Sequence, residues 1–260
     1  MNPHEFTAIR SKLQLLQDLT GDEMHQVVSW MLSGEAQPDK MKELLELLAD
    51  KGESVQELVG ATQALRDTMR QVTSSHPKVA DTCGTGGDGS KTFNISTAAA
   101  LVTAAAGVPV AKHGNRKVTS STGSADVLAE LGINLEASPE VVSACLNELG
   151  ICFCFAPYFH PAMKHAGAVR REIGRPTIFN RLGPLANPAN AGYQVLGVGD
   201  PGLQNRMAES LQQLGTRRSV VVRGADGVDE VSLSAPTRVL EVTPDNIVEH
   251  TWTPADFGLT

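Results

Sequence analysis

The sequence predicts an α/β protein in two parts: a small N-terminal helical domain, and a larger domain with a mainly parallel sheet flanked by helices. Two patterns carry this prediction. Residues 1–72 show only helical patterns, whereas short apolar runs alternate with helical segments from Val79 onward. That alternation is typical of strand–helix–strand units. With 260 residues, of which 41% are hydrophobic, the chain is also long enough to bury a substantial core.

Helix-start signals mark the N-terminal part. Thr20-x-x-Glu23 and Ser54-x-x-Glu57 are capping-box patterns, and Pro38 suits the first position of a helix. Four leucines within residues 44–48 recur at helical spacing around a charged residue. Because this part is small for an independent fold, we expect it to pack on the rest of the chain or against a second subunit.

In the larger domain, apolar runs and turn signals delimit each expected element. The expected strands are Val79–Thr82, Val108–Ala111, Ile151–Phe155, Gln194–Val198 and Ser219–Arg223, followed by the strand pair Thr237–Val242 and Asn246–Trp252. The expected helices are Ser96–Ala106, Ser124–Leu131, Pro139–Leu149, Pro161–Ile173 and Gly202–Leu214. Five strands separated by helices imply a sheet that is mainly parallel.

Charge and apolar patterns argue against several classes of protein. The formal net charge is −7 and the basic residues are dispersed, which disfavours a nucleic-acid surface. No apolar run approaches the roughly 20 residues of a membrane span. The first residues lack the basic-then-apolar order of a signal peptide. We therefore expect a soluble, cytoplasmic protein with neither nucleic acid nor a membrane as partner.

The four cysteines form neither a metal-binding nor a disulfide pattern. Cys152 and Cys154 alternate with phenylalanines in an expected strand, where buried thiols are the usual outcome. Cys83 lies in a glycine-rich loop, but no neighbour in the sequence would lower its thiol pKa. We therefore do not expect Cys83 to act as a nucleophile.

A glycine-rich stretch, Asp81–Gly89, follows the first expected strand and precedes a helix. It has glycines at 84, 86, 87 and 89. Glycine lets backbone N–H groups and the following helix N-terminus approach an anion closely, so this stretch favours phosphate binding, although glycines also form plain turns. The spacing is neither the dinucleotide fingerprint nor the nucleoside-triphosphate loop. A different phosphorylated ligand is therefore expected.

Three further polar segments carry candidate chemistry. Lys112–Arg116 follows the second expected strand, and ligands bind at the carboxyl ends of strands in open α/β sheets. Asp229 and Glu230 follow the strand Ser219–Arg223, where they form either a magnesium site or a plain acidic turn. Arg170 lies on an expected helix; it is either solvated or, if it faces the glycine loops, able to hold a carboxylate.

Taken together, these segments resemble the anthranilate phosphoribosyltransferases of tryptophan biosynthesis. The motifs are Gly84–Asp88, Asn94-x-Ser96-Thr97, Lys112–Arg116, Gly123–Asp126, His160–Lys164 and Asp229-Glu230. Their order and spacing fit that family to about residue 235. The resemblance implies a nucleoside phosphorylase/phosphoribosyltransferase-like fold, a homodimer that contacts through its helical domain, and magnesium-dependent use of phosphoribosyl pyrophosphate.

The resemblance also assigns residues to each ligand. Phosphoribosyl pyrophosphate would be bound by Gly84, Gly87, Asp88, Thr92, Asn94, Ser96, Thr97, Lys112, His113, Gly114, Asn115, Arg116, Lys117, Val118, Thr119, Ser120 and Ser124. Anthranilate would be bound by Gly84, His113, Asn115, Arg170 and Pro184, and Mg²⁺ by Ser96, Asp229 and Glu230. No general acid or base is assigned, because the weakly basic amine of anthranilate needs little proton abstraction before it attacks.

The implied reaction transfers the phosphoribosyl group to the amine of anthranilate, giving N-(5-phosphoribosyl)anthranilate and pyrophosphate. The implied domains are residues 1–72, with a returning segment near 170–190, and residues 73–260. Family members normally continue for several tens of residues, so we expect a shortened homologue or a truncated chain. Two alternatives remain at this point: a pyrimidine-nucleoside phosphorylase, which has the same architecture, and a non-catalytic relative that acts as a binding protein.

Overall fold

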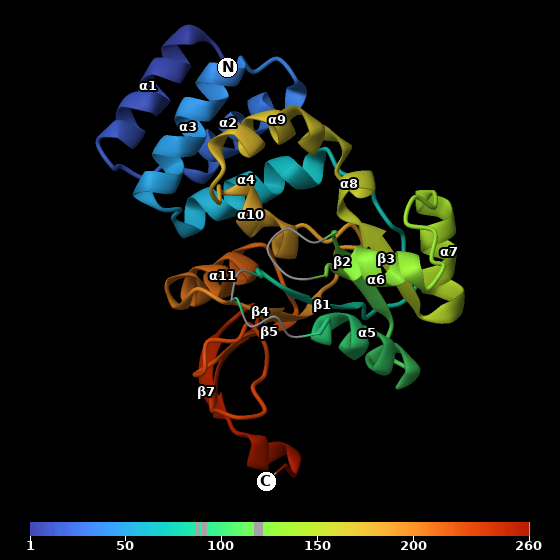
Figure 1. Ribbon diagram of the computed structural model, residues 1–260. Helices are drawn as coiled ribbons and strands as arrows, with labels where there is room; N and C mark the ends of the chain where they lie inside the picture. Colours follow the sequence, from blue (N-terminus) through green and yellow to red (C-terminus); the bar gives the residue numbers. More distant parts are fainter. Residues whose placement is uncertain (87–88, 90–92, 117–121, 260) are drawn as a thin grey trace. The chain divides into compact units, whose positions relative to one another are not determined.

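The computed structural model describes residues 1–86, 89, 93–116 and 122–259 (Figure 1). The chain divides into two compact units. Unit 1 comprises residues 1–70 and 159–186, and unit 2 comprises residues 71–158 and 187–260. The second stretch of unit 1 overlaps the segment near 170–190 for which a return to the helical domain is expected. Among the described residues, no helix is long and apolar enough to cross a membrane.

Unit 1 is helical, and three of its helices begin at the capping and proline signals that the sequence predicted. Thr20 and Ser54 both form capping boxes, with Glu23 and Glu57 respectively, and Pro38 opens α3. The α-helices are α1 (Pro3–Gln14), α2 (Gly21–Ser33), α3 (Pro38–Lys51), α4 (Val55–Asp67), α9 (Lys164–Ile173) and α10 (Phe179–Leu182), and the 3₁₀ turns are η1 (Pro161–Met163) and η2 (Gly183–Leu185).

Close packing of α2 on α4 depends on a glycine inside a helix. A Cβ at Gly60 would overlap the carbonyl oxygen of Gly21 and lie 2.9 Å from its carbonyl carbon. Beside this contact, the buried Glu57 carboxylate accepts hydrogen bonds from the Leu19 N–H at 2.9 Å and the Lys51 ammonium at 2.8 Å. Apolar side chains such as Met24, Leu44 and Leu58 are fully buried and give unit 1 a core of its own.

Unit 2 is built on one sheet. Among the described residues, seven strands lie in the order β3-β2-β1-β4-β5-β6-β7. The first five strands in this order pair in parallel, whereas β5 with β6 and β6 with β7 pair antiparallel. The strands are β1 (Ala80–Gly84), β2 (Val110–Gly114), β3 (Ile151–Phe155), β4 (Tyr193–Gly197), β5 (Arg218–Gly224), β6 (Thr237–Val242) and β7 (Ile247–Trp252). The predicted α/β class with a mainly parallel sheet is therefore confirmed.

Helices flank this sheet. They are α5 (Ile95–Ala105), α6 (Ser124–Glu130), α7 (Pro139–Leu149) and α11 (Pro201–Gln213); the short α8 (Ala156–Phe159) follows β3, and the 3₁₀ turn η3 (Pro254–Phe257) follows β7. α5 contacts β1 and β2, α7 contacts β3, and α11 contacts β5 and β6 (Figure 1). Parallel strands put their carboxyl ends at one edge of the sheet, and the loops that leave this edge carry the polar motifs.

Several predicted boundaries were wrong. β1 and β2 each continue two or three residues further than predicted, through Gly84 and Gly114, because pairing with β4 and β3 extends them. The predicted helix Pro161–Ile173 is a 3₁₀ turn followed by α9, and α8 and α10 were not predicted at all. Elements of one turn carry too little periodicity to be read from a sequence.

Candidate active site

Two acidic residues lie at the sheet edge where β1, β4 and β5 end. The Asp229 carboxylate accepts a hydrogen bond from the Gly86 N–H at 2.9 Å, and the Ser96 hydroxyl donates to Glu230 at 2.9 Å. The Asp229-Glu230 loop therefore contacts both the glycine-rich loop and the first turn of α5. The three residues predicted to hold magnesium are thus brought together, although Ser96 and Glu230 are 134 positions apart in the chain.

Two glycines, which have no side chain, make room for this loop. A Cβ at Gly84 would lie 2.7 Å from a carboxylate oxygen of Asp229. A Cβ at Gly197, the last residue of β4, would overlap the carbonyl oxygen of Asp229 and lie 2.6 Å from its carbonyl carbon. Gly197 must therefore be glycine for the acidic loop to pack on it, whereas a Cβ at Gly84 would displace the carboxylate end of the Asp229 side chain. Gly84 was predicted as a site residue, whereas Gly197 was not, because nothing in its local sequence marks it.

The oxygen donors of this site fit a hard divalent cation. Asp229 and Glu230 supply carboxylate oxygens and Ser96 a hydroxyl. Among the described residues, no group of three His, Cys, Asp or Glu side chains is arranged to hold a metal. A cation here would therefore complete its shell with waters or ligand oxygens, which is the usual arrangement for Mg²⁺.

A buried lysine lies next to this edge. The Lys112 ammonium donates to the Thr82 carbonyl at 2.6 Å, and the Thr82 hydroxyl donates to the Ser96 carbonyl at 2.7 Å. Burial lowers the pKa of Lys112, and the nearby carboxylates of Asp81 and Glu230 oppose that change. Lys112 thereby links β2, β1 and the first turn of α5, all of which carry predicted substrate residues.

The segment after β2 is held by α6. The Ser124 hydroxyl donates to the Asn115 carbonyl at 3.4 Å, and the Ala125 N–H donates to the same oxygen at 3.2 Å. Arg116 forms an ion pair with Asp126 at 3.2 Å. The other predicted residues near this segment also lie in unit 2. Asn94 donates to the Thr122 hydroxyl at 2.9 Å; His113 and Gly114 end β2, and Thr97 is near the start of α5.

Seven predicted substrate residues fall outside the described residues. They are Gly87, Asp88, Thr92, Lys117, Val118, Thr119 and Ser120.

The remaining two predicted residues belong to unit 1. Arg170 lies on α9, donates to the Asn180 amide oxygen at 3.4 Å, and lies over the Phe179 ring with 5.6 Å to its centroid. Burial lowers the pKa of Arg170. Pro184 is part of the turn η2. The guanidinium of Arg170 is thus oriented by α10, which the sequence did not predict.

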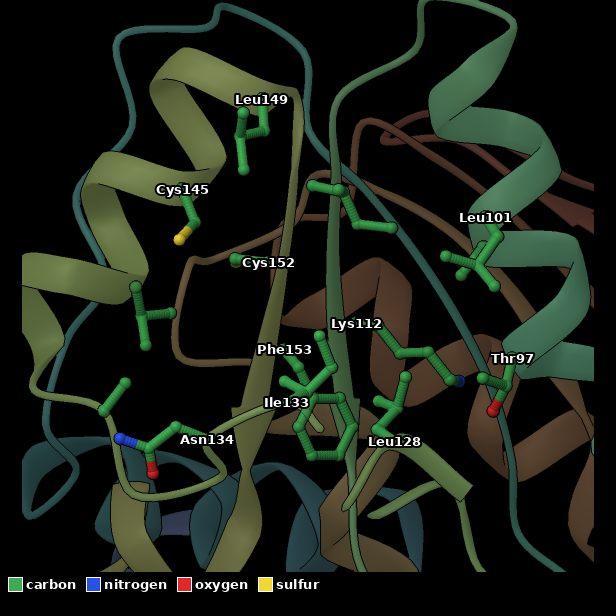
Figure 2. A pocket seen from close by; sticks show the side chains of 14 residues that line it. Thr97, Leu101, Lys112, Leu128, Ile133, Asn134, Cys145, Leu149, Cys152 and Phe153 are labelled. Atoms are coloured by element: carbon green, nitrogen blue, oxygen red, sulfur yellow. The ribbon is translucent and has the colours of Figure 1, made fainter. Parts of the chain in front are cut away.

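A mostly apolar pocket in unit 2 shares Thr97 and Lys112 with the predicted substrate residues. A cavity of about 200 Å³ lies among α5, α7, β2 and β3. Figure 2 shows Cys145 and Leu149 on one side of it and Thr97 and Leu101 on the other. Among its described lining residues only Lys112 is charged. A pyrophosphate needs cations and N–H donors, so this pocket does not suit it.

The thiol of Cys83 is not activated. Burial raises its pKa well above the usual value, and the charge of Asp81 acts in the same direction. The thiolate is the reactive form of cysteine, so a raised pKa lowers its nucleophilicity at neutral pH. This agrees with the expectation that Cys83 is not a nucleophile.

Comparisons with known proteins match both units. A family model described as the helical bundle domain of a glycosyl transferase family matches residues 7–69, and the a/b domain of that family matches residues 76–260. An anthranilate phosphoribosyltransferase from Rhodopirellula baltica is 52% identical over 243 residues, covering 94% of this chain and 71% of its own length. This chain belongs to the anthranilate phosphoribosyltransferase family.

Solved structures of this anthranilate phosphoribosyltransferase family have the same fold. The enzyme from Thermus thermophilus superposes with a TM-score of 0.90 at 44% identity, covering 97% of this chain and 75% of the other. The Saccharomyces cerevisiae enzyme, in complex with PRPP and Mg, superposes with a TM-score of 0.90 at 27% identity, covering 99% and 75%. The family therefore favours the transferase over the nucleoside phosphorylase alternative.

Proposed function

We propose that this chain is a glycosyltransferase of tryptophan biosynthesis that transfers the phosphoribosyl group of phosphoribosyl pyrophosphate to the amine of anthranilate. The products are N-(5-phosphoribosyl)anthranilate and pyrophosphate. One observation carries the proposal: Asp229 and Glu230 contact the glycine-rich loop and α5 in a chain about half identical to anthranilate phosphoribosyltransferases. A yeast relative of the same fold is described in complex with PRPP and Mg, which supports both ligands.

Ser96, Asp229 and Glu230 are the proposed magnesium ligands. When bound there, Mg²⁺ supplies positive charge that stabilises the leaving pyrophosphate. The protein orients these ligands in advance, because the Gly86 N–H and the Ser96 hydroxyl each hold one carboxylate. Ligands that are already oriented need no rearrangement as negative charge develops on the leaving pyrophosphate, and this lowers the barrier to phosphoribosyl transfer.

The proposed phosphoribosyl pyrophosphate site consists of backbone N–H groups, hydroxyls and a cation at the strand ends. Its described members are Gly84, Asn94, Ser96, Thr97, Lys112, His113, Gly114, Asn115, Arg116 and Ser124. Lys112 is held by Thr82 next to the first turn of α5, where positive charge and the helix N-terminus both favour an anion. The main contribution to the rate enhancement is then the alignment of anthranilate with phosphoribosyl pyrophosphate, and not acid–base catalysis.

Anthranilate is proposed to be bound by Gly84, His113, Asn115, Arg170 and Pro184. Arg170 is the proposed partner of its carboxylate, since a guanidinium donates two parallel hydrogen bonds to a carboxylate. The Phe179 ring and the Asn180 amide limit the positions that this guanidinium adopts. An arginine ordered in this way loses less entropy when it binds its ligand.

Replacing Arg170 tests this assignment. We expect Arg170→Ala to raise the KM for anthranilate by the equivalent of about 1.5–3 kcal/mol, because a charge-assisted hydrogen bond is lost. The KM for phosphoribosyl pyrophosphate should change little. Arg171→Ala is the matched control, since Arg171 is the next residue on the same helix and is exposed. An unchanged KM for anthranilate in Arg170→Ala would remove Arg170 from this role.

The activity itself is tested by mixing the protein with anthranilate, phosphoribosyl pyrophosphate and Mg²⁺ and following the loss of anthranilate fluorescence. We expect consumption that requires both Mg²⁺ and phosphoribosyl pyrophosphate. If nothing is consumed, calorimetry with each ligand separates two cases. Binding without turnover would indicate a binding protein, and absence of binding would contradict the site. Turnover of a pyrimidine nucleoside with phosphate would instead indicate a phosphorylase.

A homodimer that contacts through unit 1 and a cytoplasmic location complete the proposal. Leu15 and Leu16, directly after α1, are 69% and 68% exposed, and contiguous exposed apolar residues mark candidate subunit contacts. Sedimentation equilibrium tests the dimer. A monomer at micromolar concentration would contradict it.

A further inference from the structure

Two buried polar side chains, Asp81 on β1 and Asn187 before β4, lie next to the substrate-binding segment that ends β2. Asp81 is 1% exposed and Asn187 is 5% exposed. Asp81 accepts hydrogen bonds from the His113 N–H at 3.2 Å and from the Asn187 amide at 2.8 Å. The same Asn187 amide donates to the Ala111 carbonyl at 2.8 Å. Together they hold one backbone donor and one backbone acceptor of β2.

These contacts replace the ladder between β1 and β2. Along the described residues, β1 pairs with β2 at Ala80 and Val110 alone, whereas β1 pairs with β4, and β2 with β3, through five residues each. Beyond Val110, side chains satisfy the facing backbone groups of the two strands. The amide of Asn187 reaches Ala111, the carboxylate of Asp81 reaches His113, and the ammonium of Lys112 reaches the β1 backbone.

The two strands therefore stop pairing toward the edge that carries the site, and the side chains of Asp81, Asn187 and Lys112 connect them there instead. β1 leads into the glycine-rich loop, and β2 leads into His113–Asn115. The separation of these two loops is thus determined by side chains and not by a regular ladder. Both loops are proposed to contact the same substrates, so their separation determines whether the reacting atoms align.

A buried carboxylate is costly unless its oxygens are hydrogen-bonded and its charge is paired. Burial raises the pKa of Asp81, and the charge of Lys112 and the hydrogen bond from Asn187 oppose that change. Asn187 is itself fixed, because its amide oxygen accepts from the Ala189 N–H at 2.8 Å. Both the amide nitrogen and the amide oxygen of Asn187 therefore have defined partners.

We propose that Asp81 and Asn187 are positioning residues for phosphoribosyl transfer. They hold the end of β2 at a fixed distance from β1, and they act through the backbone of Ala111 and His113. The inference rests on the proposed function, because the segment that they position is the proposed substrate-binding segment.

The first test compares Asn187→Ala with Gln204→Ala. Gln204, on α11, is a matched control because it is 1% exposed and its amide donates to two backbone carbonyls, those of Val221 and Arg238, both at 3.0 Å. Both variants leave buried carbonyls without a donor, so both should lower the melting temperature. We expect kcat/KM to fall about tenfold to a hundredfold in Asn187→Ala and to stay near wild type in Gln204→Ala.

A second readout needs no substrate. Amide hydrogen exchange of residues 110–116 should be about tenfold faster in Asn187→Ala than in wild type, since the hydrogen bonds that hold this segment are lost. Gln204→Ala should leave exchange in 110–116 unchanged. If the wild type shows no transfer but exchange still responds in this way, the proposed function fails while the structural role of the pair stands.

A reciprocal exchange addresses loss of folding. In the double variant Asp81→Asn with Asn187→Asp, an amide at 81 faces a carboxylate at 187, so the hydrogen bond between the side chains is restored in reverse. The bond to the Ala111 carbonyl is not restored, because a carboxylate has no N–H to donate. Each single variant puts like groups together. We expect the double variant to recover several-fold of the kcat/KM that the single variants lose. A double variant no more active than Asn187→Asp, or equal activity losses in Asn187→Ala and Gln204→Ala, would overturn the proposal.

Discussion

Replacing Gly197 by alanine is the sharpest test of how the acidic loop is held. A Cβ at this position would overlap the Asp229 carbonyl oxygen and lie 2.6 Å from its carbonyl carbon, whereas real Cβ contacts essentially never fall below 3.0 Å. The obstacle is backbone and not the end of a flexible side chain, so the acidic loop itself must move. That movement pulls the Asp229 carboxylate away from the Gly86 N–H, to which it is bonded at 2.9 Å.

The expected loss is large in activity and moderate in stability. Misplacing a catalytic group by roughly 1 Å costs about a hundredfold in rate, and overpacking a close contact costs about 1–3 kcal/mol of folding free energy. We therefore expect Gly197→Ala to remain folded below its lowered melting temperature, with kcat/KM reduced about a hundredfold. The concentration of Mg²⁺ that gives half-maximal activity should rise at the same time.

The assay is anthranilate consumption over a Mg²⁺ titration, with Gly192→Ala as the control. Gly192 immediately precedes the same strand, at its other end, and the atoms nearest to a Cβ there belong to the Arg217 side chain, at 3.2 Å and beyond. A flexible side chain moves aside, so this control should keep its activity and its Mg²⁺ requirement. Wild-type activity and Mg²⁺ dependence in Gly197→Ala would refute the claim that the strand end positions the carboxylates.

Three smaller predictions concern single contacts. Ser96→Ala removes the hydroxyl that holds Glu230, and we expect the Mg²⁺ requirement to rise about fivefold to tenfold, measured by titration. Gly60→Ala should lower the free energy of unfolding by about 1–3 kcal/mol in denaturant titrations, because its Cβ would overlap the Gly21 carbonyl. The Asp226 carboxylate accepts hydrogen bonds from the hydroxyls of Ser232 and Ser234, and these bonds lower its pKa. The ionised carboxylate therefore stabilises the folded state to its full extent at pH values above the usual pKa of an aspartate. The stability difference between wild type and Asp226→Asn should therefore vanish as the pH falls through that lowered pKa.

Local signals in the sequence were enough for the outline of the fold. Capping boxes at Thr20 and Ser54 begin two helices as predicted, because a cap satisfies N–H groups within four residues of itself. The alternation of apolar runs with helical segments predicted the parallel sheet, since each strand needs a crossover helix. Strand ends were less well predicted: β1 extends to Gly84 because it pairs with β4, and that pairing is not a local property.

By itself the sequence determined the fold class, the order of the strands that the polar loops follow, and the chemistry that those loops carry. Only the tertiary structure decided which of these groups share an environment. Asp81 and Asn187 are 106 positions apart, yet their side chains are hydrogen-bonded to each other beside β1 and β2. Gly197 is required by the backbone of Asp229 and not by any neighbour in the chain. Such constraints arise from close packing between distant segments, and the periodicity of a single element carries no information about them.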